Sequence, residues 1–171
     1  MVEPVIRPAT EADARTIAEI HVAGWVAAYR GMVPDELLAS LSVDDRESMW
    51  RRAAGREDQT LLVAERAGGT VGFVSAGPTG DQDVHDATGE IYAIYVQPGH
   101  VGTGAGRALL SRAVEALRAR GFRRATLWVL DANERGRSSY EAAGWRPDGA
   151  SKVEDWNGFP LREVRYETDI T

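Results

Sequence analysis

Two patterns of apolar residues alternate along this chain and predict its secondary structure. Short runs rich in branched and aromatic residues, closed by glycine or proline, are typical of β-strands. Apolar residues that recur every three or four positions are typical of helices. We expect strands at 5–7, 60–66, 70–76, 90–96, 124–130, 145–148 and 161–168, with loops at 77–87 and 149–158. We expect helices from Thr10, from Pro34, over 45–54 with Asp44 as cap, from Gly106 to Gly121, and over 131–144.

The stretch from Glu90 to Leu117 combines a buried strand, a glycine-rich turn and an amphipathic helix. Pro98 and Gly99 end the strand, because proline lacks the amide that a sheet needs. After the turn, apolar residues fall three or four positions apart and so share one helix face. They are Leu109, Leu110, Ala113, Val114 and Leu117.

The turn itself carries glycine at 102, 104 and 106. Without side chains, these residues let a ligand lie directly against the backbone. The first amides of the following helix have no internal partner and lie at the positive end of the helix dipole, which favours phosphate. The alternative is a flexible loop that needs glycine for its bends.

Two common phosphate-binding patterns do not fit this turn. A Walker loop requires Lys and then Ser or Thr after its second glycine, but Gly104 is followed by Ala105 and Gly106. A dinucleotide fingerprint requires a further glycine three positions on, where this chain has Arg107 or Leu109.

The turn resembles the pyrophosphate loop of the GNAT N-acetyltransferase superfamily. That loop reads Gln or Arg, two residues, Gly, one residue, then Gly or Ala. Gly104 and Gly106 fill the glycine places, whereas Val101 stands where the family has a polar side chain. The backbone donors survive this departure, and any contact of the usual side chain is lost.

A second segment extends the resemblance. Asn133 to Trp145 resembles the family's motif of an asparagine, a helix that carries a tyrosine, and a glycine followed by an aromatic residue. The order of strands and helices predicts a mixed sheet with helices on both faces. The resemblance implies an α/β fold whose mostly antiparallel sheet is splayed between its fourth and fifth strands, in one domain over residues 1–171.

Composition narrows the functional classes. The 171 residues are 43% hydrophobic and carry a net charge of −6, which argues against a nucleic-acid partner. No apolar stretch approaches the roughly 20 residues of a membrane span, and the N-terminus lacks a signal-peptide pattern. With no cysteine, disulfides and thiolate sites are excluded. We expect a cytoplasmic, bacterial protein and leave a homodimer open.

The resemblance implies acetyl-CoA as co-substrate. Backbone groups of Ile94, Tyr95 and Val96 should meet its pantetheine arm, and Asn133 should hold the same arm. The pyrophosphate should lie on Val101, Gly102, Thr103, Gly104, Ala105 and Gly106. Arg107, Arg135 and Arg137 could reach the phosphates, with solvation at the surface as the alternative.

The resemblance also assigns the chemistry. Tyr140 occupies the family's tyrosine position, and a phenol of pKa ~10 can protonate the leaving thiolate. The alternative is a buried aromatic residue. Glu90 stands where many members of the family place the base that deprotonates the amine. The alternative interpretation is a carboxylate at the strand edge that is exposed to solvent. Ser138 and Ser139 have no adjacent histidine, so we expect direct transfer without an acyl-enzyme.

The acceptor site is expected on the helix that carries Trp25 and Tyr29, which lie four residues apart and so share a face. With Glu90 and Tyr92 they should line one pocket, although core packing of the two aromatic residues is an equal alternative. Strand alternation places Glu90, Tyr92 and Ile94 on one side.

Two histidines have simpler explanations than chemistry. His21 beside the first helix's apolar stripe is read as a packed residue, and His85, near three aspartates, as a solvated loop residue. We expect no metal.

Three functions remain open on the sequence. The first is an N-acetyltransferase that acts on a primary amine of a small molecule. The second is a protein or peptide N-acetyltransferase, and the third is an acyl-CoA-binding protein without turnover. The acidic chain would attract a cationic amine, which favours the first.

Overall fold

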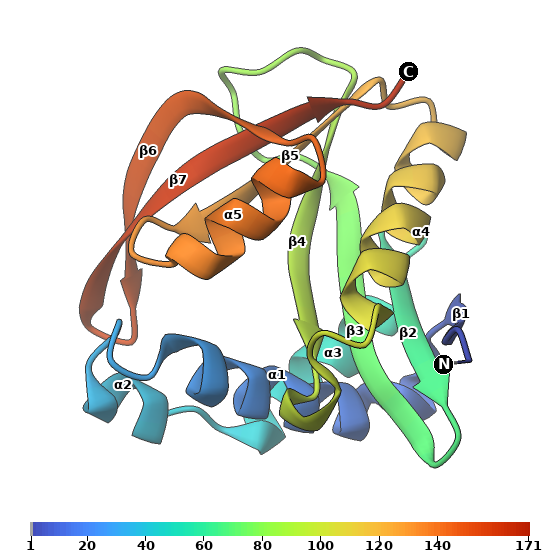
Figure 1. Cartoon of the computed structure of the whole chain (residues 1–171), viewed down its shortest axis with the longest axis vertical. Helices are drawn as coiled ribbons and strands as arrows, with labels where there is room; N and C mark the ends of the chain where they lie inside the picture. Colours follow the sequence, from blue (N-terminus) through green and yellow to red (C-terminus); the bar gives the residue numbers. More distant parts are fainter. Residues whose placement is uncertain (1) are drawn as a thin grey trace.

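A seven-stranded sheet organises residues 2–171, the part of the chain that the computed structural model describes (Figure 1). The strand order is β1-β2-β3-β4-β5-β7-β6. All neighbouring strands are antiparallel except β4 and β5. The strands are β1 (Val5–Pro8), β2 (Thr60–Arg66), β3 (Gly69–Pro78), β4 (Thr88–Val96), β5 (Arg124–Leu130), β6 (Arg146–Trp156) and β7 (Phe159–Asp169).

Five α-helices connect the strands: α1 (Ala14–Tyr29), α2 (Asp35–Ala39), α3 (Val43–Ala54), α4 (Ala105–Ala119) and α5 (Glu134–Ala142). Short 3-10 turns precede α1 at Glu11–Asp13 and α4 at Pro98–His100. The helical region begins after Thr10, as predicted, and the Asp13 carboxylate accepts from the Thr10 amide at 2.8 Å in a capping box. The cap predicted at Asp44 is wrong, because the Ser42 hydroxyl accepts from the Asp45 amide and α3 starts earlier.

Helices cover both faces of the sheet, as predicted. Leu62 and Ala64 of β2 point into a core beneath α4, whereas Leu61 and Val63 pack against α1 and α3. This alternation follows from the pleat of a strand. Figure 1 shows α4 and α5 on the near side, with β3 passing in front of α1.

The predicted splay between β4 and β5 is present. The two strands pair only from Thr88 to Ile91 on β4 and from Arg124 to Leu127 on β5, although both continue further. The β5-facing edge of β4 from Tyr92 to Val96 therefore has no partner strand. Backbone groups on this edge are free for a ligand.

A β-bulge lies in β4 at the start of this opening. Ser75 pairs with Ala93 and Ala76 with Ile91, so Tyr92 is an extra residue. The bulge breaks the expected alternation, and Ile94 packs with Ile91 in the core beneath α4. The prediction that Ile94 shares a face with Glu90 and Tyr92 is therefore wrong.

The C-terminal hairpin also differs from expectation. The region read as a four-residue strand and a ten-residue loop is one long strand, β6, that pairs with β7. A tight turn at Asn157 and Gly158, both with positive φ, joins them, and Asn-Gly is a strong hairpin signal. The register shifts between Pro147 and Ser151, where a bulge holds Asp148 opposite Arg165.

Candidate active site

The loop before α4 presents unused backbone donors. Gly102 and Gly104 have φ of 81° and 90°, a region that favours glycine, and a Cβ added at either would point into open space. Within residues 2–171 the amides from Gly104 to Arg107 donate no hydrogen bond. With the positive end of α4 behind them, these amides fit a pyrophosphate without obstruction. The free amides at the start of α4 therefore suit the pyrophosphate of an acyl-CoA.

Arg66, at the end of β2, fixes this loop from outside. Its Nη2 donates to the Thr103 carbonyl at 2.7 Å, and the Thr103 hydroxyl donates to the His100 carbonyl at 2.6 Å. Sequence reasoning did not find Arg66, because 37 residues separate it from Thr103 and no motif links them.

A cavity of about 230 Å³ lies at the opening between β4 and β5. It brings together the five side chains predicted for chemistry and acceptor binding: Trp25, Tyr29, Glu90, Tyr92 and Tyr140. Ile94, Tyr95 and Asn133, predicted to meet the pantetheine arm, line it as well. Sequence reasoning missed several further lining residues, namely Trp128, Lys152, Glu154, Trp156 and Glu163. Alternation along β7 was an available signal for Glu163, since every second residue from Leu161 to Glu167 shares a face.

Tyr140 faces the cavity from α5. Its ring packs edge-on against Trp145 at 6.2 Å between centroids and lies 6.4 Å from Tyr166. Burial raises the pKa of Tyr140 above its ordinary value, with a smaller contribution from Tyr29. The phenol therefore keeps its proton at neutral pH, which is the state that a proton donor needs.

Glu90 lies across the cavity on β4. The Thr79 hydroxyl donates to its Oε2 at 3.0 Å. Burial raises the pKa of Glu90 above its ordinary value, and the hydrogen bond from Thr79 opposes part of that rise. A carboxylate with a raised pKa is a stronger proton acceptor than a solvent-exposed one.

The loop that carries Thr79 is anchored by Arg165 of β7, which is 4% exposed. Its Nη1 donates to Asp81 at 3.0 Å and to Asp83 at 2.8 Å, and its Nε to Asp148 at 2.6 Å. The Asp81 amide in turn donates to the Thr79 hydroxyl at 3.1 Å. A chain of hydrogen bonds therefore runs from Arg165 to Glu90.

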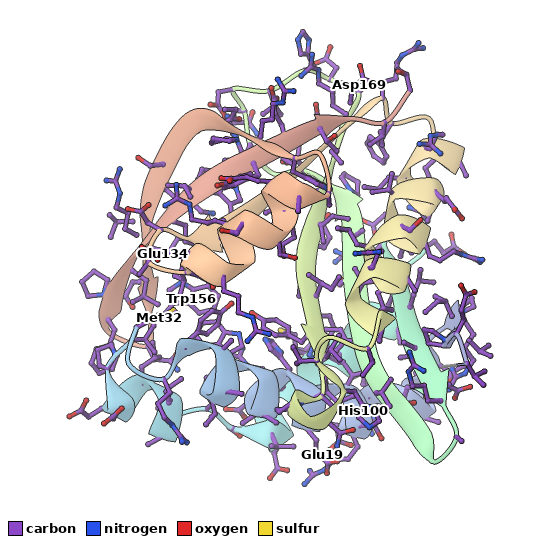
Figure 2. All side chains as sticks on the ribbon, in the orientation of Figure 1. Glu19, Met32, His100, Glu134, Trp156 and Asp169 are labelled. Atoms are coloured by element: carbon purple, nitrogen blue, oxygen red, sulfur yellow. The ribbon has the colours of Figure 1, made fainter. Side chains whose placement is uncertain are left out.

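Aromatic rings form the opposite wall. Trp25 lies 4.7 Å from Tyr29 and 4.9 Å from Trp156 between ring centroids. Figure 2 labels Trp156, which lies at the end of the β6–β7 hairpin between α5 and α1. The hydroxyls of Tyr29 and Tyr95 are 3.0 Å apart, and the Tyr92 hydroxyl donates to the Pro78 carbonyl.

Two of the remaining residues predicted to bind the co-substrate, Asn133 and Arg137, have structural partners. Asn133 caps α5 by accepting from the Gly136 amide at 2.9 Å. Arg137 donates to Asp131 and to the Tyr166 hydroxyl. Arg107 and Arg135 are exposed. Their contacts with phosphate stay predictions.

The histidines behave as packing and surface residues. Trp50 Nε1 donates to His21 Nδ1 at 3.1 Å, and burial, together with the charge of Arg46, lowers the pKa of His21 to about 3. His85 borders a second hollow of about 420 Å³ beside Arg165, whose charged groups already pair with one another. The smaller cavity, which Glu90 and Tyr140 line, is the better candidate site.

Comparison with known proteins identifies the family. The model of the acetyltransferase (GNAT) family matches residues 17–145. The chain belongs to the GNAT acetyltransferases. This GNAT chain is accordingly an acyltransferase that uses an acyl-CoA co-substrate.

Individual relatives agree with the family match. An uncharacterized N-acetyltransferase, YuaI of Bacillus subtilis, is 36% identical over 130 residues, which are 75% of this chain and 72% of the relative. The L-amino acid N-acyltransferase MnaT of Escherichia coli is 33% identical over 113 residues, or 66% of this chain and 62% of MnaT.

A solved structure agrees over the whole length. YncA from Salmonella typhimurium, a putative acetyltransferase solved with acetyl-CoA, has a TM-score of 0.73 and 25% identity, and the match covers 99% of this chain and 95% of YncA. No helix among residues 2–171 is long and apolar enough to cross a membrane.

Proposed function

We propose that this GNAT protein transfers an acetyl group from acetyl-CoA to the primary amine of a small molecule by direct attack. The observation that carries the proposal is that Glu90 of β4 and Tyr140 of α5 line the same cavity at the splay. A proton acceptor and a proton donor are the two groups that amide formation from a thioester requires.

Each residue has a defined task. Acetyl-CoA supplies the acetyl group as a thioester. The amides from Gly104 to Arg107 bind the pyrophosphate, and the free edge of β4 from Tyr92 to Val96 offers hydrogen bonds to the pantetheine arm. These backbone groups orient the thioester toward the cavity.

Proton transfer belongs to the two side chains. Glu90 accepts a proton from the amine nitrogen, directly or through one water, as the new C–N bond forms. Tyr140 holds a proton at its hydroxyl for the sulfur as the C–S bond breaks. The raised pKa of each group favours its assigned direction of transfer.

The size and enclosure of the cavity favour a small acceptor. A volume of about 230 Å³ is below the range of typical drug-sized ligand sites, and its walls come from six strands and helices, namely α1, α5, β4, β5, β6 and β7. The name of the relative MnaT, an amino acid N-acyltransferase, also supports a small amine.

Thiol release tests the proposal. Purified protein with acetyl-CoA is offered a panel of small amines and peptides, and the expected result is CoA release that depends on a small amine, with the acetylated product found by mass spectrometry. Release with peptides alone would assign a protein acceptor. Tight acetyl-CoA binding without release for any amine would assign a binding protein.

A further inference from the structure

Glu163 of β7 is a buried carboxylate whose ion pair with Lys152 is long. It is 8% exposed and lines the candidate cavity. Within residues 2–171 its carboxylate accepts no side-chain hydrogen bond, and its nearest cation, Lys152 Nζ, lies 3.8 Å away. That ammonium donates instead to Glu154 at 2.9 Å. A buried carboxylate that lacks a hydrogen-bonded cation is unfavourable unless a ligand provides one.

Glu90 of β4, which is partly buried, lines the same cavity and also lacks a cation that donates to it. Its described partner is the neutral hydroxyl of Thr79, and no ion pair involves it among residues 2–171. Burial is the main cause that raises the pKa of both Glu90 and Glu163, and the charge of Glu90 adds to the rise at Glu163. The two carboxylates are therefore within electrostatic reach of each other.

Register gives the spacing of their backbones. Glu90 pairs with Thr126 of β5, and Glu163 pairs with Leu130 four residues further along the same strand. Four residues of a strand span about 13 Å, so side chains that reach into one cavity from these points leave room for a short flexible chain.

The residues that line the cavity suit a ligand that carries a positive charge at each end. Three carboxylates and one ammonium line the cavity, with Glu154 as the third carboxylate. The rings of Trp25, Tyr29 and Trp156 form the wall, and ring faces attract ammonium groups while they exclude water.

We propose that the acceptor is a small aliphatic diamine, with Glu90 at the ammonium that becomes acetylated and Glu163 at the second ammonium. This inference rests on the proposed function and names the substrate class of the same site. Each ligand cation supplies the charge that one buried carboxylate lacks, and the methylene chain lies along the aromatic wall.

Matched amines of equal length test the second charge. Thiol release is measured with acetyl-CoA and 1,4-diaminobutane, butylamine, 4-aminobutan-1-ol and a lysine-containing peptide. We expect kcat/KM for the diamine to exceed that for butylamine and the amino alcohol by at least about tenfold, mainly through KM. The diamine should also raise Tm more than butylamine does, since a ligand stabilises the state that it binds.

Two variants assign the preference to Glu163. Glu163→Gln keeps the shape of the side chain and removes its charge, so the ratio of diamine to butylamine should fall to about one. Glu167→Gln is the control. Glu167 lies four residues further along β7, outside the cavity, and forms an ion pair with Arg124. It should keep the wild-type ratio.

The outcomes separate this inference from the proposed function. Acetylation of butylamine and diamine with equal kcat/KM, or a preference that survives in Glu163→Gln, would overturn the diamine assignment and leave the acetyltransferase proposal standing. Acetylation of the peptide alone, or no amine-dependent release, would overturn both. Circular dichroism of each variant shows whether a lost preference reflects lost structure.

Discussion

At the opening between β4 and β5, the two faces of the sheet carry different types of residue. Beneath α4 lies a mostly aliphatic core that several strands share, and the glycine turn and α4 that cover it come from one continuous stretch, Gly102 to Ala119. The opposite face, here called the acceptor face, gathers Glu90, Tyr92, Trp128, Lys152, Trp156 and Glu163 with the rings of α1. In our proposal the glycine turn, which is local in sequence, binds the co-substrate through backbone groups, whereas the acceptor face acts through side chains that only the tertiary fold assembles.

This contrast predicts different responses to substitution. Side-chain changes on the acceptor face should alter chemistry, acceptor choice or stability and leave binding of the co-substrate almost unchanged. Changes at the glycine turn should do the reverse.

Tyr140→Phe should have the largest effect. The ring and its packing remain, and only the proton donor is lost, so the chemical step should slow by about 10²–10⁴-fold while CoA affinity changes little. Single-turnover kinetics measure the step. Tyr166→Phe removes the neighbouring hydroxyl outside the cavity and should keep the rate. A Tyr140→Phe protein with wild-type rate would make this tyrosine structural.

Arg165→Leu should cause the largest loss of stability. The substitution leaves Asp81 and Asp148, both largely buried, without their common cation, which costs about 3 kcal/mol, whereas the exposed Asp83 adds little. Denaturant unfolding measures the change. Arg124→Leu, which breaks an exposed pair with Glu167, should cost much less. Equal losses in both variants would mean that Arg165 does not anchor the acceptor face.

Glu90→Gln should slow turnover most at low pH, by about 10²-fold at the acid end. The raised pKa means that wild-type Glu90 loses its proton-accepting form as pH falls through that value. In the variant, only amine that is already deprotonated reacts, so its rate rises with pH toward the wild type. A pH–rate profile that overlays the wild type would remove Glu90 as base.

Glu163→Gln should stabilise the protein slightly, in contrast to Arg165→Leu. Because burial raises the folded-state pKa of Glu163, its charged form disfavours folding above that pKa. The variant should therefore have a higher Tm than the wild type at pH 7. The difference should vanish below the pKa of an unfolded glutamate. A lower Tm at pH 7 would show that Lys152 already satisfies this carboxylate.

The sequence predicted the local features well. The order of strands and helices along the chain and the position of the glycine turn are confirmed, because apolar periodicity and a motif within one stretch determine them. The splay, which the family resemblance implied, is confirmed as well. Two local features were misread. The bulge at Tyr92 arises from pairing with β3, and the length of β6 depends on pairing with β7 across Asn157 and Gly158.

The acceptor face could be predicted only in part. Trp25, Tyr29, Glu90 and Tyr92 do line one cavity, but Trp156 and Glu163 approach them from the far end of the chain. Their place depends on the register of the C-terminal hairpin, which periodicity alone does not give. The roles of these residues, the single domain, the cytoplasmic location and the homodimer stay predictions.

One titration tests the central claim that the two faces bind different substrates. CoA is titrated by calorimetry into the wild type, Gly104→Val, Gly106→Ala and Glu163→Gln, with folding checked by circular dichroism. Gly104→Val places a branched side chain over the free amides of α4, whereas an added Cβ at Gly106 meets only Val96 at an ordinary 3.6 Å.

We expect CoA affinity to fall at least about tenfold in folded Gly104→Val, since its side chain covers the helix amides and strains the turn at a φ of 90°. Affinity should stay near wild type in the other two variants. Unchanged affinity in folded Gly104→Val, or a loss of CoA affinity in Glu163→Gln equal to that in Gly104→Val, would contradict the central claim.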